Sequence, residues 1–287
     1  MLVETVFGPA GYPVRGPSGP GAMAYLAKRG LFAMEYQAVR SVRIGREFAE
    51  ELGGAARKNN IVLSLHGPYA VNLSSDDDSI VKASKGRLIK AAVAAHNMGA
   101  FHLTFHLGYY GEKTKEEALI LELEGLRDVT GALKSKGISV ELGPETTGKE
   151  SQLGSLDEVL ELSARLDNVR PTIDFAHIHV RDPDSKLVGC EDFLRVLERV
   201  ESRLGSDRMN SLVLHFTEVE PTATGFGERK HHRLGSGRGP KFEYLAEALV
   251  EAGHKVIVIS ESPLLDEDAL KMKKIYEKRL STRRGHG

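Results

Sequence analysis

Six apolar runs in this sequence each end at a side chain that can bind a metal ion. The runs are IVLSLH, FHLTFH, SVELGPE, PTID, LVLH and VIVISE. Their last residues are His66, His106, Glu145, Asp174, His215 and Glu261. Mixed imidazole and carboxylate donors suit Zn, Mn, Fe or Co better than Ca. The single cysteine, Cys190, argues against a closed thiolate zinc site and favours open catalytic metal sites.

Each of these side chains has a simpler interpretation when it is considered alone. His66 and His106 could be hydrogen-bonded structural histidines, and Asp174 could cap the segment that follows it. Glu261 could likewise cap a helix. Together these interpretations are harder to sustain, because buried unpaired carboxylates are costly and converging carboxylates repel unless cations lie between them. We therefore predict one pocket that holds more than one divalent cation.

The hydrophobic pattern alternates between short apolar runs and longer amphipathic runs, which indicates strands alternating with helices. Strands are expected near 2–7, 31–37, 61–66, 101–107, 138–143, 170–175, 212–217 and 255–260. Helices are expected near 22–29, 45–58, 78–98, 115–136, 155–166, 190–203, 242–252 and 266–279. This alternation predicts a single-domain (β/α)8 TIM barrel over residues 1–280, with a disordered tail at 281–287. Such a barrel gathers its strand ends, and hence the predicted ligands, on one face.

An open doubly wound sheet is the alternative fold, but no GxGxxG sequence follows the first strand. Two long connections are expected, a Gly- and Pro-rich loop at 8–21 and a second loop at 217–241. Long loops in a compact domain are usually functional or mobile. The second loop contains Arg229, Lys230 and Arg233, which could follow a phosphate backbone. A solvated, flexible basic loop is the other interpretation.

Composition excludes several classes of protein. The 287 residues carry 39 basic and 40 acidic side chains, so no global charge points to nucleic acid, and any attraction to a polyanion must be local. No apolar run approaches the ~18 residues that a membrane span needs. The start, MLVETVFGPAGYP, lacks the basic then apolar layout of a secretion signal, so none is expected. One cysteine permits no internal disulfide, as in a reducing compartment. We expect a cytoplasmic monomer without membrane association.

The sequence resembles the endonuclease IV family of apurinic/apyrimidinic (AP) endonucleases over nearly its whole length. The resemblance rests on SLHGPYAVNL (64–73), FHLGYYG (105–111), PETTGKESQLG (144–154), IDFAH (173–177), LHF (214–216), KHHRLG (230–235) and SESP (260–263). It adds His177 and His231 to the six predicted ligands and implies two or three Zn²⁺ per chain, with Mn²⁺ as a substitute. His66 and His106 would serve the first ion with Glu145 as a bridge. Asp174, His215 and Glu261 would serve the second, and His177 and His231 the third.

The resemblance also implies a reaction and a partner. The partner would be double-stranded DNA with an abasic site, and the phosphodiester on the 5′ side of that site would be hydrolysed to leave a 3′-hydroxyl. Glu145 and Glu261 would be the catalytic residues. Contacts to DNA are expected from Tyr69, Arg229, Lys230 and Arg233.

Two departures from the family pattern concern the third ion and the DNA wedge. The family places an Asp two residues before its third-site histidine, where this chain has Arg229; Glu228 could substitute if the loop shifts. Tyr69 is followed by Ala70, so the wedge is smaller. A sugar isomerase or epimerase of the same superfamily is the competing interpretation, because Glu145, Asp174, His215 and Glu261 alone could hold one ion. A non-catalytic DNA-binding relative is the third.

Overall fold

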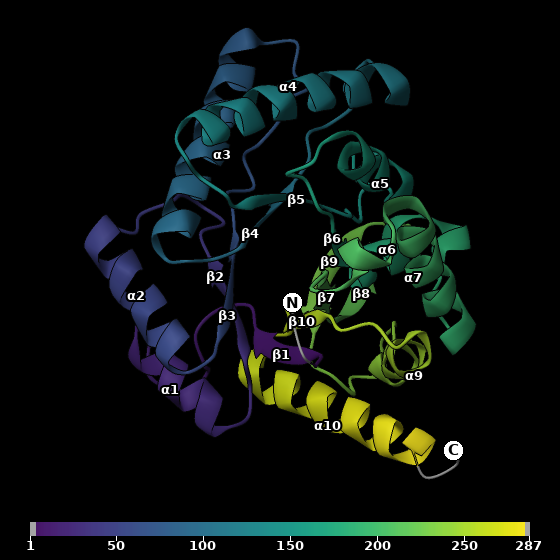
Figure 1. Cartoon of the computed structure of the whole chain (residues 1–287). Helices are drawn as coiled ribbons and strands as arrows, with labels where there is room; N and C mark the ends of the chain where they lie inside the picture. Colours follow the sequence, from purple (N-terminus) through teal and green to yellow (C-terminus); the bar gives the residue numbers. More distant parts are fainter. Residues whose placement is uncertain (1–3, 285–287) are drawn as a thin grey trace.

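Eight parallel strands form a barrel in the computed structural model, which describes residues 4–284. Helices surround the strands (Figure 1). Around the barrel the strands follow in the order β1, β10, β7, β6, β5, β4, β3 and β2. Their bounds are Val6–Pro9 (β1), Ala33–Gln37 (β2), Val62–His66 (β3), His102–His106 (β4), Glu141–Glu145 (β5), Thr172–Asp174 (β6), Val213–Phe216 (β7) and Ile257–Ser260 (β10). The predicted single-domain TIM barrel is confirmed as a fold.

The barrel closes between its first two strands. The amide of Phe32 donates to the carbonyl of Phe7 at 3.1 Å, and Ala10 forms a parallel bridge with Glu35. Gly8 permits this close approach, because a Cβ there would lie 1.8 Å from the carbonyl oxygen of Ala33. Closure places the carboxyl ends of all eight strands around one mouth.

Within residues 4–284, eight longer helices follow the strands, as predicted. They are α1 (Gly21–Lys28), α2 (Arg46–Lys58), α3 (Asp78–Asn97), α4 (Lys115–Ser135), α5 (Leu156–Arg165), α7 (Cys190–Leu204), α9 (Phe242–Ala252) and α10 (Leu265–Arg284). Three shorter helical segments add α6 (Phe175–Arg181), η1 (Pro183–Ser185) and α8 (Ser206–Met209). The α5 start shows why the sequence folds this way: the Ser155 hydroxyl accepts from the amide of Glu158, whose carboxylate accepts from the Ser155 amide at 2.8 Å.

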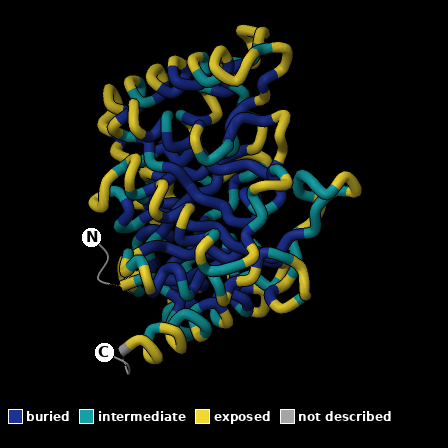
Figure 2. Tube along the Cα trace, turned by 90° about the vertical axis from the view of Figure 1, so that its right-hand side faces the viewer, coloured by how far each residue is buried: buried dark blue, intermediate teal, exposed yellow. Residues whose placement is uncertain are grey.

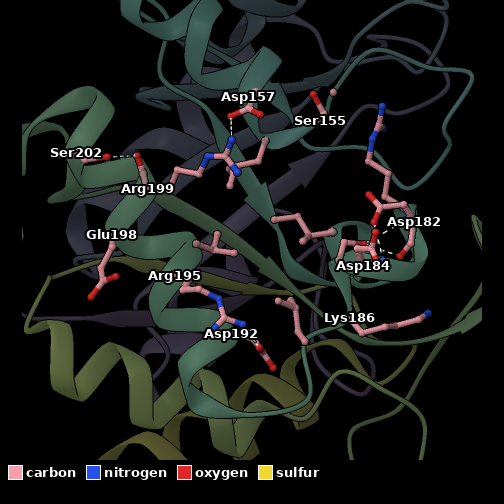
Figure 3. A pocket seen from close by; sticks show the side chains of 17 residues that line it. Ser155, Asp157, Asp182, Asp184, Lys186, Asp192, Arg195, Glu198, Arg199 and Ser202 are labelled. Carbon is pink, nitrogen blue, oxygen red and sulfur yellow. Dashed lines mark hydrogen bonds and ion pairs between the residues drawn. The ribbon is translucent and has the colours of Figure 1, made fainter.

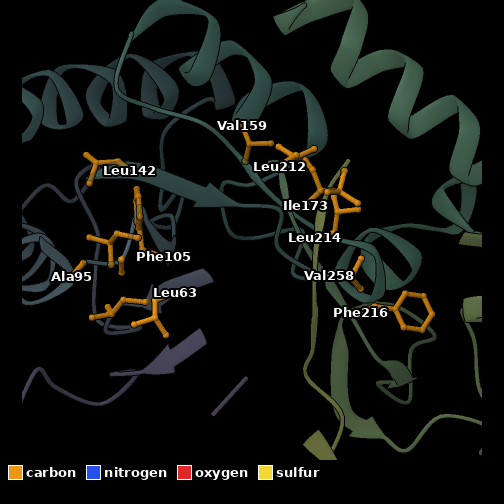
Figure 4. Close-up of a cluster of buried hydrophobic side chains, with 14 of the residues drawn as sticks. Leu63, Ala95, Phe105, Leu142, Val159, Ile173, Leu212, Leu214, Phe216 and Val258 are labelled. Atoms are coloured by element: carbon orange, nitrogen blue, oxygen red, sulfur yellow. The ribbon is translucent and has the colours of Figure 1, made fainter. Parts of the chain in front are cut away.

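The main hydrophobic core lies between the outer wall of the barrel and the helices. Phe105, Leu142 and Leu214 point outward from the strands, and the helices contribute Ala95 and Val159 (Figure 4). The central segments are buried and the exposed residues lie at the periphery (Figure 2). Within residues 4–284, no helix is both long and apolar enough to cross a membrane.

Three expectations about elements need correction. The first strand starts at Val6 rather than near residue 2, and residues 1–3 lie outside the described range. The connection at 217–241 is not structureless, because it folds into an antiparallel hairpin of β8 (Glu218–Pro221) and β9 (Glu228–His232). Helix α10 continues to Arg284, so residues 281–284 are helical; residues 285–287 of the expected tail lie outside the described range.

Glu122 of α4 braces two loops that lead out of the barrel mouth. Its Oε1 accepts from the amides of Leu73 and Gly108 at 3.1 and 3.0 Å. Burial raises the pKa of Glu122 to about 7, although these backbone donors oppose the shift. The folded chain therefore holds a proton here that the unfolded chain has released, so this group makes stability fall as pH rises from about 4.5 to 7.

Glu122→Gln should remove that part of the pH dependence, because glutamine mimics the protonated carboxyl. We expect the free energy of unfolding at pH 8 to exceed that of the wild type by up to about 3 kcal/mol, and the two to converge at pH 5. Urea unfolding at both pH values measures this, with Glu124→Gln, an exposed position on the same helix, as the control. An unchanged pH dependence in Glu122→Gln would contradict the assignment.

Candidate metal centre

The structure brings all eight predicted ligands together at the mouth of the barrel. His66, His106, Glu145 and Asp174 end strands β3, β4, β5 and β6 in turn. Four more come from neighbouring segments: His215 in β7, Glu261 directly after β10, His177 in α6 and His231 in β9. With Glu228 added, they form three groups of potential metal ligands. The groups are His66, His106 and Glu145; Glu145, Asp174, His215 and Glu261; and His177, Glu228 and His231.

The first two groups share Glu145. Its Oε2 lies 3.2 Å from His66 Nε2 and 2.9 Å from His106 Nε2. Its Oε1 lies 2.9 Å from Nδ1 of His215, which is also 3.4 Å from Glu261 Oε1. The Glu145 carboxylate therefore faces both groups, with Oε2 directed to the first group and Oε1 to the second.

The third group is completed by Glu228. Its Oε2 lies 2.6 Å from His177 Nε2, and its Oε1 lies 2.9 Å from His231 Nε2. Arg229 turns away from the group, where its exposed guanidinium pairs with Glu220 at 2.8 Å. The hairpin thus directs the side chain of Glu228, and not that of Arg229, toward the two histidines.

Helix α6 explains the placement of His177. Asp174 ends β6 and caps α6, because its Oδ1 accepts from the amide of His177 at 2.9 Å. The Nδ1 of His177 lies 2.8 Å from the carbonyl of Thr146, which can only accept, so this nitrogen carries the proton. The other nitrogen, Nε2, therefore faces Glu228, whose Oε2 lies 2.6 Å away.

Divalent cations fit this donor set. Asp174 Oδ2 is buried and has no hydrogen-bond partner among residues 4–284. Burial raises the pKa of Glu261, with His215 opposing the shift and Glu145 and Asp174 adding to it. Burial alone would lower the pKa of His215, yet Glu35, Glu261 and Glu145 raise it well above its usual value. The carboxylates of the three groups lie close together at the barrel mouth, so their mutual repulsion must be offset by positive charge between them.

One functional candidate was missed from the sequence. Glu35 in β2 is fully buried inside the barrel, and its Oε2 lies 3.2 Å from His215 Nε2. The available signal was a carboxylate in the middle of the apolar run LFAMEY, where a buried charge needs partners.

The residues expected to contact DNA lie at or near the same rim. The exposed ring of Tyr69 has its centroid 5.4 Å from that of His66 and 5.0 Å from that of His106. Lys230 and Arg233 are exposed on and beside β9 and form no ion pair within the described part of the chain. Arg229 is exposed as well, but it is already paired with Glu220.

A separate cleft of about 670 Å³ is lined by residues of α5, α6, η1 and α7. It includes none of the nine side chains of the three groups. Two ion pairs join charged residues of its lining, Arg199 with Asp157 and Arg195 with Asp192 (Figure 3). The cleft therefore offers no chemistry comparable to that of the barrel mouth.

The sequence matches one family model and two relatives over most of its length. The family model described as "Xylose isomerase-like TIM barrel" matches residues 23–278. An uncharacterised protein of Methanocaldococcus jannaschii, MJ0133, is 33% identical over 276 residues, which cover 96% of this chain and 97% of that protein. A probable endonuclease 4 of Acholeplasma laidlawii is 25% identical over 214 residues, or 73% of this chain and 69% of that protein.

Solved structures of two functional classes share the fold. Endonuclease IV from Thermus thermophilus superposes with a TM-score of 0.67 at 19% identity, covering 96% of this chain and 99% of that one. An L-ribulose 3-epimerase superposes with a TM-score of 0.71 at 12% identity, covering 98% and 96%. Likeness at these identities establishes the architecture and does not separate the two chemistries.

Proposed function

This chain belongs to the xylose isomerase-like TIM barrel family, a family of enzymes, and we propose that it is a metal-dependent DNA repair endonuclease. Its proposed reaction is hydrolysis of the phosphodiester 5′ to an abasic site, leaving a 3′-hydroxyl. The observation that carries this proposal is the set of three adjoining ligand groups linked in part by Glu145. A single-metal isomerase would need only the group of four, and the histidines at 66, 106, 177 and 231 would then have no shared purpose.

The proposed cofactor is Zn²⁺, two or three ions per chain, with Mn²⁺ as a substitute. Such ions acidify water, neutralise phosphate charge and stabilise a leaving oxygen. The chain's own residues would hold and order the reactants. We assign Glu145 to fixing the spacing between the first two groups, and Glu261 to orienting the attacking water and accepting its proton.

Recognition of the abasic nucleotide is assigned to the rim. A nucleotide without a base costs less to rotate out of the duplex than a paired one. Tyr69 stands exposed beside His66 and His106, where its ring could take the place of the rotated nucleotide. The neighbouring Ala70 adds little volume, so we assign most of the wedge to the tyrosine ring.

The second candidate function is a single-metal sugar epimerase, which the likeness to L-ribulose 3-epimerase supports. The two candidates are separated by incubating the protein with a duplex that carries one synthetic abasic site, with and without chelator. The nuclease proposal predicts chelator-sensitive incision on the 5′ side of that site. Turnover of a ketose without any incision would reverse the assignment.

The basic residues of the hairpin give a further prediction about DNA affinity. A plot of log affinity against log salt concentration has a negative slope, because each phosphate contact releases counterions. Lys230→Ala and Arg233→Ala should each make this slope less steep by about 1. The measurement is fluorescence anisotropy of abasic duplex over a range of salt concentrations. Lys136→Ala is the matched control, because Lys136 is exposed at the end of α4, just before β5 begins at the opposite end of the barrel. Equal slopes for all variants would remove these residues from the DNA surface.

A further inference from the structure

Glu35 is a buried carboxylate inside the barrel, below the proposed metal centre. It has no exposed surface. Its Oε2 accepts from the hydroxyls of Ser64 and Thr104 at 3.0 and 3.1 Å, and its Oε1 accepts from Gln37 Nε2 at 3.1 Å. The interior of such a barrel is ordinarily filled by branched apolar side chains. A buried carboxylate with so many dedicated donors calls for a role beyond filling space.

The histidines of the centre differ in which ring nitrogen they turn toward the carboxylates. His66, His177 and His231 each direct Nδ1 to a backbone carbonyl, of Gly67, Thr146 and Glu261, at 2.9, 2.8 and 3.0 Å. A carbonyl can only accept, so these Nδ1 atoms carry protons and each Nε2 faces the carboxylates.

His215 has the reverse arrangement. Its Nδ1 lies 2.9 Å from Glu145 Oε1, within the group of four, and its Nε2 lies 3.2 Å from Glu35 Oε2. The outer nitrogen of His215 therefore contacts a side-chain carboxylate, whereas the outer nitrogens of His66, His177 and His231 each contact a backbone carbonyl.

We propose that Glu35 is a positioning residue of the metal centre, which holds a proton of His215 on Nε2 so that Nδ1 can offer its lone pair to a cation held together with Glu145, Asp174 and Glu261. The inference rests on the metal centre of the proposed function. An anionic partner on the outer nitrogen fixes the ring orientation and increases the basicity of a ligating histidine. Ser64 and Thr104 in turn hold Glu35 in place.

Metal affinity tests the proposal without any DNA. Zn²⁺ dissociation constants are measured by competition with a chromophoric chelator for the wild type, Glu35→Gln and Glu35→Ala. Both variants should bind one equivalent about 10- to 100-fold more weakly, with the remaining equivalents within about threefold of the wild type. Glu141→Gln is the matched control, because Glu141 pairs with Arg170 at 2.9 Å at the end of β5 opposite to Glu145; its affinities should stay within about threefold of the wild type.

The protonated nitrogen is a second readout that a purely structural role would not move. In the zinc-loaded wild type, long-range ¹H–¹⁵N spectra should show the proton of His215 on Nε2 and those of His66, His177 and His231 on Nδ1. The His215 signals should shift or disappear in Glu35→Ala.

Wild-type affinity for every equivalent in folded Glu35→Gln would overturn the proposal, as would a proton on Nδ1 of His215. If Glu35→Ala fails to fold, Glu35→Gln decides, because it keeps the volume and an acceptor oxygen. A wild type that binds zinc tightly but does not incise abasic DNA would overturn the endonuclease proposal and leave this one standing.

Discussion

Glu145→Gln is expected to reduce incision of abasic DNA at least about a thousandfold, equivalent to about 4 kcal/mol of transition-state stabilisation. The carboxylate is fully buried and faces two ligand groups at once. Removing its charge weakens both groups, so the effect should exceed the 10²- to 10³-fold loss typical of one electrostatic donor. Single-turnover incision of a duplex with one abasic site gives the rate, and elemental analysis should show less zinc per chain.

The control for this substitution lies at the other end of the same strand. Glu141→Gln alters a partly buried carboxylate that pairs with Arg170 at 2.9 Å, far from the ligand end of β5. It should keep wild-type zinc content and incision within about threefold. Full zinc content and near-normal incision in folded Glu145→Gln would show that Glu145 does not bridge a metal centre.

Glu228→Ala has the second largest expected effect, a loss of about 100-fold in incision together with one equivalent of zinc. Glu228 supplies both oxygens of the third group, one to His177 and one to His231. Without it, two histidines remain, which is too few to compete for a divalent cation with the groups beside them. Incision kinetics and zinc content of the purified variant are the measurements.

Arg229→Ala is the matched control, because it is the adjacent residue and its side chain points away from the centre. Its zinc content should equal that of the wild type, and its incision rate should fall no more than about threefold. Should Arg229→Ala lose the zinc and Glu228→Ala retain it, the assignment of the third group would be wrong.

The ligands at strand ends were predictable because a parallel barrel brings residues that end different strands to the same end of the molecule. Each of His66, His106, Glu145 and Asp174 directly ends an apolar run, and parallel strands in a closed barrel all end at the same mouth. The strand and helix ranges followed from the change in hydrophobic period, and most bounds lie within a few residues of the expected ones.

The third group was less predictable because its geometry depends on a hairpin. The connection 217–241 lacks a strong alternating pattern, so nothing local indicated that β8 and β9 would pair. Only the folded hairpin shows that position 228, and not 229, faces His177.

Glu35 was missed for a different reason. Its partner His215 lies 180 residues away in sequence, and strand alternation alone does not tell the interior of a barrel from its outer wall. A carboxylate in an apolar strand could equally have pointed at a helix. The signal becomes specific only when β2, β3, β4 and β7 are assembled and four donors converge on one side chain.

Zinc content per chain is the most direct test of the central claim that these groups form one multi-metal centre. Native mass spectrometry of the protein after zinc loading and removal of excess metal counts the bound ions. The three groups predict three equivalents for the wild type and two for Glu228→Ala. A single equivalent, or none, in the wild type would contradict the account.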